Sequence, residues 1–98
     1  MTYNLDFTRS ARREWDRIDA ALREQFKNKL DERLRNPRVV ADAMRRMPSC
    51  YKIKLRKSGF RLVYLVQDER ITVLVLSVGK RDADKTYLKA ARELDDLD

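Results

Sequence analysis

The chain has 98 residues, enough for one small domain with a modest core but not for two. Its 23 lysines and arginines against 16 acidic residues give a net charge of +7, which favours a polyanionic partner, nucleic acid before membrane surface, although charge can also serve solubility alone. The chain contains no histidine, the commonest acid–base residue and metal ligand, and its single cysteine, Cys50, excludes an intrachain disulfide. The polar start MTYNLDFTRS shows no signal peptide and no apolar run approaches the roughly 20 residues that cross a bilayer, so we expect a cytoplasmic protein without a membrane partner.

The N-terminal third predicts a strand and two helices. Residues 3–7 alternate apolar and polar side chains, which indicates a short half-buried strand. Thr8 or Ser10 can cap a first helix, and Asp19 can cap a second one that the Asn-Pro pair at 36–37 would end. Each helix carries a core-facing apolar stripe at helical spacing. The stripes are Ala11, Trp15 and Ile18 on the first helix, and Leu22, Phe26, Leu30 and Leu34 on the second.

Residues 38–48 show no periodic pattern, so we expect an irregular connection. Four apolar side chains could anchor it to the core: Val39, Val40, Met44 and Met47. Arg45 and Arg46 come shortly before the next predicted strand. We therefore expect them to extend any cationic surface that this strand forms.

The stretch 50–64, CYKIKLRKSGFRLVY, predicts a β-hairpin with an apolar face and a cationic face, because strand side chains alternate between faces. A two-residue turn at 57–58 would gather six apolar residues on one face by pairing Leu55 with Phe60, Ile53 with Leu62 and Tyr51 with Tyr64. A slip by one residue would set lysines against leucines. The same register puts Arg61 opposite Lys54, and facing like charges cost stability. We interpret these charges as functional.

The C-terminal third predicts a central strand and a third helix. Asp68 and Glu69 mark a tight turn into 71–78, ITVLVLSV, which is apolar on both faces and so should be covered on both sides. The first two helices would form one cover and a helix over 83–94 the other, near the cationic face, with a stripe of Leu88, Ala91 and Leu94. We therefore predict an α+β fold spanning 1–98 in the order βααβββα: an antiparallel sheet of about four strands with two N-terminal helices on one face and a short C-terminal helix at the other.

A candidate nucleic-acid site follows from the segment GKRDADKTY at 79–87. Pairing through the turn at 68–69 would set Phe60 opposite Ser77 and bring Arg81 close to Arg61, with Tyr87 at the start of the third helix. Single-stranded nucleic acid is bound by cations that hold phosphates beside an aromatic ring that stacks on a base. The predicted site consists of Lys52, Lys54, Arg61, Arg81 and Tyr87, and the additional RNA-binding residues are Arg45, Arg56 and Lys80.

The acidic end ELDDLD has two possible roles. It could compete with an anionic ligand for the basic site, or it could be a frayed and solvated terminus. Unchanged RNA affinity after cutting the chain behind Arg92 would exclude the competition.

The element order, the run MPSCYKIKLRKSGFRLVY, the later LSVGKR and a downstream tyrosine together resemble the RelE family of ribosome-dependent mRNA endonucleases, which are bacterial toxins. The motifs YNLDF near the start, REW at 13–15 and NPR at 36–38 extend the resemblance over about residues 1–92. The wider superfamily includes ParE-type toxins that act on DNA gyrase, so fold alone does not decide function. The basic residues of the RelE family match at Lys52, Lys54, Arg61 and Arg81, and its functional tyrosine matches at Tyr87.

The resemblance implies metal-independent cleavage of mRNA within the ribosomal A-site codon, by attack of a ribose 2′-OH that leaves a 2′,3′-cyclic phosphate and a 5′-OH. Neighbouring cations and partial burial disfavour the charged form of a lysine, so Lys54 is best placed to act as general base. Lys52 and Arg61 would stabilise the transition-state charge. Arg81 would protonate the leaving 5′-oxygen, or stabilise its charge while water supplies the proton. Tyr87 would stack on a codon base.

The resemblance also implies partners but no cofactor. A RelB-like antitoxin would wrap the toxin, could displace the third helix, and would provide the contacts to operator DNA. The 70S ribosome, through its rRNA, and mRNA would be the targets. Cations on the outer faces of the first two helices could meet rRNA phosphates or could simply be solvated: Arg9, Arg12, Arg13, Arg23 and Lys27. The alternatives are a gyrase-directed toxin and a non-catalytic RNA- or ribosome-binding module.

Overall fold

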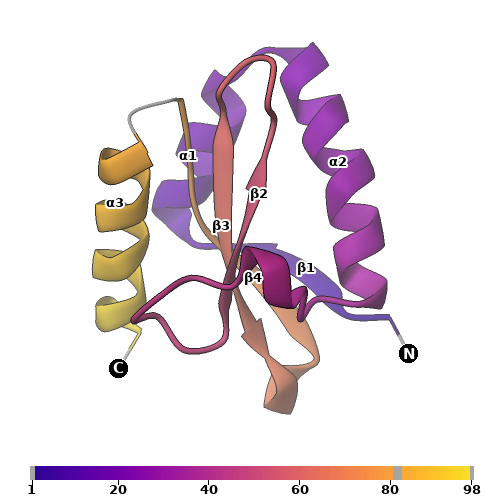
Figure 1. Cartoon of the computed structure of the whole chain (residues 1–98), viewed down its shortest axis with the longest axis vertical. Coiled ribbons are helices and arrows are strands. Elements are labelled where there is room, and N and C mark those ends of the chain that lie inside the picture. Colours follow the sequence, from indigo (N-terminus) through magenta and orange to yellow (C-terminus); the bar gives the residue numbers. More distant parts are fainter. Residues whose placement is uncertain (1, 81–82, 98) are drawn as a thin grey trace.

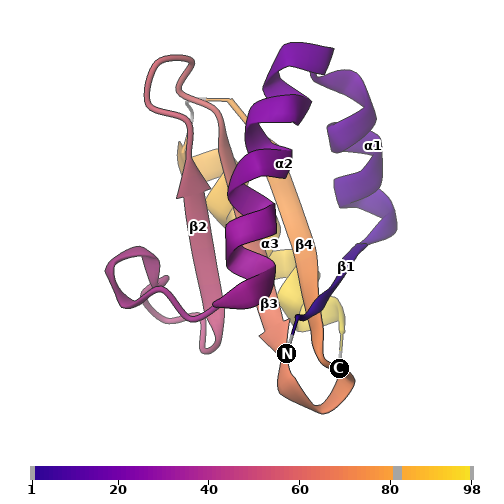
Figure 2. The ribbon, with the colours of Figure 1, turned by 90° about the vertical axis from the view of Figure 1, so that its right-hand side faces the viewer.

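A four-stranded sheet separates two helices on one face from one helix on the other (Figures 1 and 2). The computed structural model describes residues 2–80 and 83–97. The α+β class and the predicted element order are confirmed. The elements are β1 (Asn4–Phe7), α1 (Arg9–Arg17), α2 (Ala20–Arg35), the short 3₁₀ helix η1 (Val40–Asp42), β2 (Cys50–Lys54), β3 (Arg61–Gln67), the 3₁₀ helix η2 (Asp68–Arg70), β4 (Thr72–Gly79) and α3 (Ala83–Asp96).

The sheet is mixed, which corrects the antiparallel expectation at one strand. Its order is β1-β4-β3-β2, and β1 runs parallel to β4 whereas the other neighbours are antiparallel. A parallel pair needs a long crossover connection, and all elements between β1 and β4 provide it. The alternation in residues 3–7 predicts a strand correctly, but it carries no information about the direction of its neighbour. β4 lies inside the sheet and is buried along almost its whole length, as its apolar sequence predicts.

The two N-terminal helices form as predicted. Thr8 Oγ1 accepts a hydrogen bond from the Ala11 amide at 3.1 Å, and Asp19 Oδ1 accepts one from the Leu22 amide at 3.0 Å, so each side chain caps its helix. Asn36 follows the last turn of α2. The apolar stripes pack against the sheet in one core, which contains Ala11, Trp15, Phe26, Leu30, Tyr51, Ile53, Leu62, Tyr64, Val73 and Val75.

The hairpin keeps its predicted register but closes differently. Lys54 lies opposite Arg61 and Tyr51 opposite Tyr64. The turn has four residues, 56–59, because the Leu55 amide donates to the Phe60 carbonyl at 2.9 Å. The Gly59 amide donates to the Leu55 carbonyl at 2.8 Å, with a φ of 80° at Gly59. Glycine adopts this left-handed conformation without strain, and this explains why the loop extends to residue 59 instead of closing at 57–58.

The predicted register between β3 and β4 is wrong. Ser77 pairs with Val63, not Phe60, and Arg61 pairs with Gly79. Two features cause the three-residue shift: the turn is longer than predicted, since η2 is followed by left-handed Ile71, and a bulge lies between Val63 and Tyr64. The correct register still brings the end of β4 beside Arg61.

Two predicted apolar contacts are also wrong. Val40 is 86% exposed, so it does not anchor the connection, whereas Met47 is buried. Leu88 is 63% exposed, since the inner face of α3 is formed by buried Ala90 with half-buried Tyr87 and Leu94. The small Ala90 side chain allows α3 to pack closely on the sheet. None of the described helices is long and apolar enough to cross a membrane.

The acidic end is helical, which corrects the expectation of a frayed terminus. α3 continues to Asp96, and Thr8 Oγ1 donates a hydrogen bond to Glu93 Oε1 at 2.9 Å. Asp95 and Asp96 are exposed to solvent, as expected.

Candidate active site

A cationic cluster lies where the outer end of the β2–β3 hairpin meets α3. Lys54 is exposed at the end of β2 and pairs across the ladder with Arg61 on β3. Arg61 Nη1 donates to Tyr87 Oη at 3.4 Å, which connects the hairpin to α3. Lys52 lies on the same face of β2 as Lys54, since it is two residues away. The structure thus brings four of the five predicted site residues together, and the fifth, Arg81, lies outside the described residues.

Two hollows connect two of the three additional RNA-binding candidates to this cluster. A groove of about 670 Å³ is lined by Arg45, Lys52 and Tyr87, with apolar walls that include Met44, Met47 and Leu88. A smaller pocket of about 240 Å³ at the hairpin end is lined by Lys54, Arg56 and Arg61. Lys80 Nζ lies 5.9 Å from the ring centroid of Phe60, at the same end of the sheet. Arg45 and Arg56 therefore lie beside the cluster, whereas Lys80 lines a different groove with Lys85 and Lys89.

The Arg61 guanidinium has unused hydrogen-bonding capacity. Its Nε is buried and has no hydrogen-bond partner among the described residues. Buried polar atoms in native proteins are nearly always paired, and exceptions often occur at functional sites. The unpaired Nε costs folding free energy, so its retention marks Arg61 as a candidate functional residue.

A buried arginine that the sequence did not reveal fixes the backbone beneath the cluster. Arg33 Nη1 donates to the Lys52 carbonyl at 3.2 Å and to Tyr64 Oη at 2.9 Å, while Nη2 lies 2.6 Å from Asp42 Oδ2. The Arg33 side chain is only 12% exposed. Burial raises the pKa of Tyr64, and the adjacent Arg33 opposes that rise. Position 33 is three residues after buried Leu30, so helical spacing places Arg33 on the inner face of α2. This spacing was the one sequence signal that could have predicted its role.

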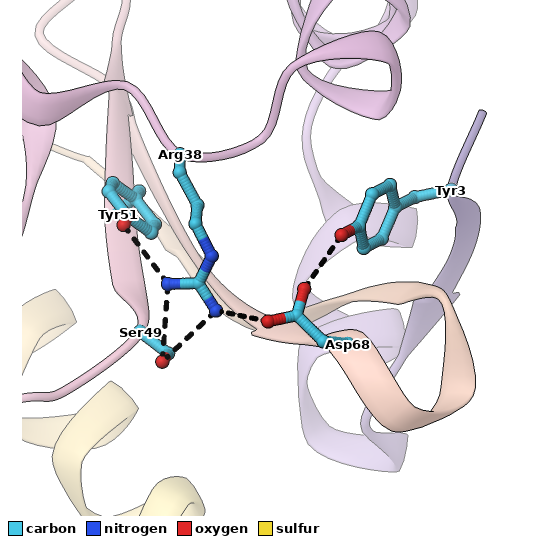
Figure 3. A network of polar contacts seen from close by, with 5 residues as sticks. All are labelled: Tyr3, Arg38, Ser49, Tyr51 and Asp68. Carbon is cyan, nitrogen blue, oxygen red and sulfur yellow. Dashed lines mark hydrogen bonds and ion pairs between the residues drawn. The ribbon is translucent and has the colours of Figure 1, made fainter. Parts of the chain in front are cut away.

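A second polar network lies at the opposite end of the molecule and fixes chain segments rather than exposing cations (Figure 3). Asp68 Oδ1 accepts a hydrogen bond from Tyr3 Oη at 2.7 Å, and Asp68 Oδ2 pairs with Arg38 Nη2 at 2.7 Å. The hydrogen bond from Tyr3 and then that from Arg38 lower the pKa of Asp68. Arg38 also reaches Ser49 and Tyr51, so the network joins the N terminus, η2 and the start of β2.

The chemistry available to the cluster is limited. Cys50 is buried, and burial raises the pKa of its thiol to about 11, so it is a poor nucleophile at neutral pH. Within residues 2–80 and 83–97, no group of cysteine, aspartate and glutamate side chains has an arrangement that could hold a metal ion. The remaining reactive groups are amines, guanidinium groups and a phenol, which suit charge stabilisation and proton transfer on an anionic substrate.

The chain matches known toxins along most of its length. Residues 5–85 match the family described as "ParE toxin of type II toxin-antitoxin system, parDE". The chain is 50% identical over 94 residues to the mRNA interferase toxin RelE of Escherichia coli K12, covering 96% of this chain and 99% of that protein. The mRNA interferase RelE of Shigella flexneri matches with the same identity and coverage.

Solved structures agree with the sequence matches. A mutant of E. coli RelE in the free state superposes with a TM-score of 0.87 at 51% identity, covering 94% of this chain and 97% of that one. A chain in the intact E. coli RelBE toxin-antitoxin complex gives 0.78 at 55% identity, with 80% and 95% covered. This chain therefore belongs to the RelE toxins, within the ParE-type toxin family of type II toxin–antitoxin systems. The resemblance seen in its motifs is confirmed.

Proposed function

We propose that this toxin is an mRNA interferase that cuts mRNA in the ribosomal A site, by attack of a ribose 2′-OH that yields a 2′,3′-cyclic phosphate and a 5′-OH, and so inhibits translation. The observation that carries the proposal is the facing pair Lys54 and Arg61, with Arg61 bonded to Tyr87. Relatives that are 50% identical over nearly the whole chain carry the name mRNA interferase.

Each residue of the cluster has a chemical role in this reaction. Lys54, exposed at the end of β2, takes the proton from the 2′-OH as general base. Lys52 and Arg61 hold the scissile phosphate and stabilise the charge that grows on it in the transition state. Arg81 acts on the leaving 5′-oxygen, as proton donor or as charge stabiliser beside a water. No metal takes part in these steps.

The groove beside Tyr87 suits a nucleotide next to the cut. The Tyr87 ring and the side chains of Met44 and Met47 offer apolar surface to a base. Arg45 and Lys52, which also line the groove, offer positive charge to the RNA backbone. The site is open and contains no histidine, so its chemistry depends strongly on how the substrate is positioned. The ribosome and its rRNA supply this positioning by presenting the codon.

The partner of the toxin is a RelB-like antitoxin that displaces α3, and operator DNA is reached only through that antitoxin. Among the described residues of α3, Ala90 is the one fully buried hydrophobic residue. Polar links also hold the helix: Ser77 Oγ donates to the Thr86 carbonyl at 2.9 Å, and Lys89 Nζ lies 2.5 Å from Glu14 Oε1. The toxin acts in the cytoplasm.

Mapping of new 5′ ends on mRNA tests the proposal. Purified toxin is added to programmed ribosomes and to naked mRNA, with Lys54→Ala as the inactive variant and Lys29→Ala on the exposed face of α2 as the matched control. We expect cuts at codon spacing on programmed ribosomes and none on naked mRNA. These cuts should be lost in Lys54→Ala and kept in Lys29→Ala. Equal cutting by wild type and Lys54→Ala would contradict the assignment.

Growth assays separate this activity from the two alternatives. For an mRNA interferase, Lys54→Ala and Arg81→Ala should relieve growth arrest and restore translation, whereas a gyrase-directed toxin should still arrest growth in both variants. A non-catalytic ribosome-binding module would keep inhibiting translation in both variants. A toxin shortened before Ala83 should lose cleavage but still bind the antitoxin, and loss of that complex would argue against displacement of α3.

A further inference from the structure

A second groove, on the other side of α3 from Tyr87, is lined by cations that, apart from Lys80, lie outside the candidate active site. It has a volume of about 790 Å³ and lies between the end of β4, α1 and the outer side of α3. Its charged lining residues are Lys80, Lys85, Lys89, Arg92 and Glu14. Apart from Lys80, none of these cations follows from the hairpin pattern or from the site motifs.

The charge in this groove is positive and only partly neutralised. Glu14 Oε1 accepts a hydrogen bond from the Val78 amide at 3.0 Å and lies 2.5 Å from Lys89 Nζ, so its charge is already paired. Lys85 and Arg92 are exposed, and they are seven residues apart on α3. At 1.5 Å per residue this places them about 10 Å apart along the helix axis, two turns that face the same way. Such a row of cations fits an extended polyanion better than a single small anion.

The groove adjoins the groove of the candidate active site at one residue of α3. Leu88, 63% exposed, lines both this groove and the groove that contains Lys52 and Tyr87. A strand that stacks one base on Tyr87 can therefore pass over Leu88 and set its next phosphates beside Lys85 and Arg92. Leu88 is the single large apolar residue of the groove lining, so the groove offers little to an apolar protein segment.

We propose that this groove binds the sugar–phosphate backbone of the RNA strand next to the cleaved nucleotide, with Lys85 and Arg92 as its phosphate-contacting residues. The inference rests on the proposed function, because it takes RNA as the substrate. It extends the substrate site across α3, beyond the residues that act on the scissile phosphate. An acidic segment of a protein is the competing occupant.

The test measures binding of an RNA that cannot be cut. A fluorescein-labelled, fully 2′-O-methylated 12-nucleotide RNA is titrated with full-length toxin at several salt concentrations. The groove variant is Lys85→Gln/Arg92→Gln, and the control is Lys29→Gln/Arg70→Gln, which removes the same charge from exposed positions on α2 and η2. Each phosphate contact with a single strand contributes about 0.7 to the slope of log affinity against log salt. We expect the groove variant to reduce the slope by about 1.4 and affinity at low salt by about tenfold, with a much smaller change in the control.

Equal slopes in the groove variant and the control would overturn the proposal. It would also be overturned if the groove variant bound RNA like the control but lost affinity for a 12-residue polyglutamate peptide. Cleavage on programmed ribosomes is measured separately. Its absence, together with a reduced slope in the groove variant, would contradict the proposed function and leave the groove assignment in place.

Discussion

The two faces of the sheet are covered in different ways. Toward α1 and α2, aromatic side chains fill the core: the Trp15 and Phe26 rings lie 6.2 Å apart, and Tyr51 stacks on Tyr64 at 5.8 Å. Toward α3, the described buried core residues include no aromatic ring: they are Met47, Cys50, Val63, Leu74, Leu76 and Ala90. Every candidate catalytic residue that the structure describes lies around the second face or at its edge.

This difference indicates that stability and function are separated across the sheet. The large apolar area toward α1 and α2 holds the strands in register, and burial of such area is the main favourable term in folding. The α3 face then carries facing cations and an unpaired guanidinium nitrogen, which oppose folding.

Lys54→Ala should affect catalysis far more than stability. Removal of a general base typically lowers the rate by about 10²–10⁴-fold. The free energy of unfolding should be unchanged or slightly increased, because the substitution removes a like-charge pair with Arg61. Single-turnover cleavage on programmed ribosomes and urea unfolding measure the two quantities. A destabilised variant with normal cleavage would contradict the separation.

Phe26→Ala should have the opposite profile. Phe26 is fully buried, and truncation of a buried phenylalanine costs about 3–5 kcal/mol of unfolding free energy. The folded fraction should retain the cleavage rate of the wild type, since Phe26 packs in the core toward α1 and α2, on the face of the sheet away from α3. Urea unfolding checks the first expectation, and activity per folded molecule checks the second. Lys29→Ala on the same helix is the control, with little expected change.

Arg33→Met should affect both stability and catalysis, because Arg33 lies on α2 but donates a hydrogen bond to the Lys52 carbonyl beneath the cationic cluster. Breaking its partly buried pair with Asp42 should cost about 2 kcal/mol. As a positioning residue, it should lower the cleavage rate at saturating ribosome concentration more than it changes the half-saturating concentration. Arg33→Lys should restore part of the stability but not the rate. A change in half-saturation alone would exclude the positioning role.

Glu14→Gln should loosen α3 selectively. It removes the ion pair with Lys89 but keeps an oxygen for the Val78 amide, so the loss should be about 1 kcal/mol or less. Amide hydrogen exchange should become faster in α3 while that in α2 stays unchanged. Faster exchange in both helices would show that α3 is not a separate unit.

The Asp68 network should add a small pH dependence at the end far from the site. The pKa of Asp68 is lowered in the folded protein. Asp68 therefore contributes stability at pH values above the ordinary aspartate pKa of about 4, and this contribution is lost as the pH falls through the folded pKa. Asp68→Asn should flatten the acid limb of the stability curve without affecting cleavage at neutral pH. An identical acid limb in the variant would contradict this assignment.

The pattern of apolar residues predicted those parts of the fold in which a shift of one residue would expose apolar side chains and bury charged ones. The β2–β3 register is of this kind, since a slip would bury Lys52 and Lys54, and so are the stripes of α1 and α2. The β3–β4 register could not be predicted in this way, because left-handed Ile71 and the bulge after Val63 leave no local pattern.

The candidate site was predictable where cations alternate with apolar residues along a strand, as at Lys54 and Arg61. The polar contacts of Arg33 and Glu14 were not predictable, because they depend on segments that meet only in the folded chain. Leu88 was misplaced for a related reason: the approach of α3 is decided by small Ala90, and a hydrophobic residue at the wrong angle stays exposed.

Cleavage of an mRNA with one 2′-deoxynucleotide at the mapped cut position tests the proposed chemistry most directly. On programmed ribosomes, the toxin should leave this position intact, while the all-ribose message is cut and ends in a 2′,3′-cyclic phosphate. The deoxy message should still bind, because the cationic contacts go to phosphates. Cutting of the deoxy message at an undiminished rate would contradict the account, since the 2′-oxygen could not then be the nucleophile that Lys54 activates.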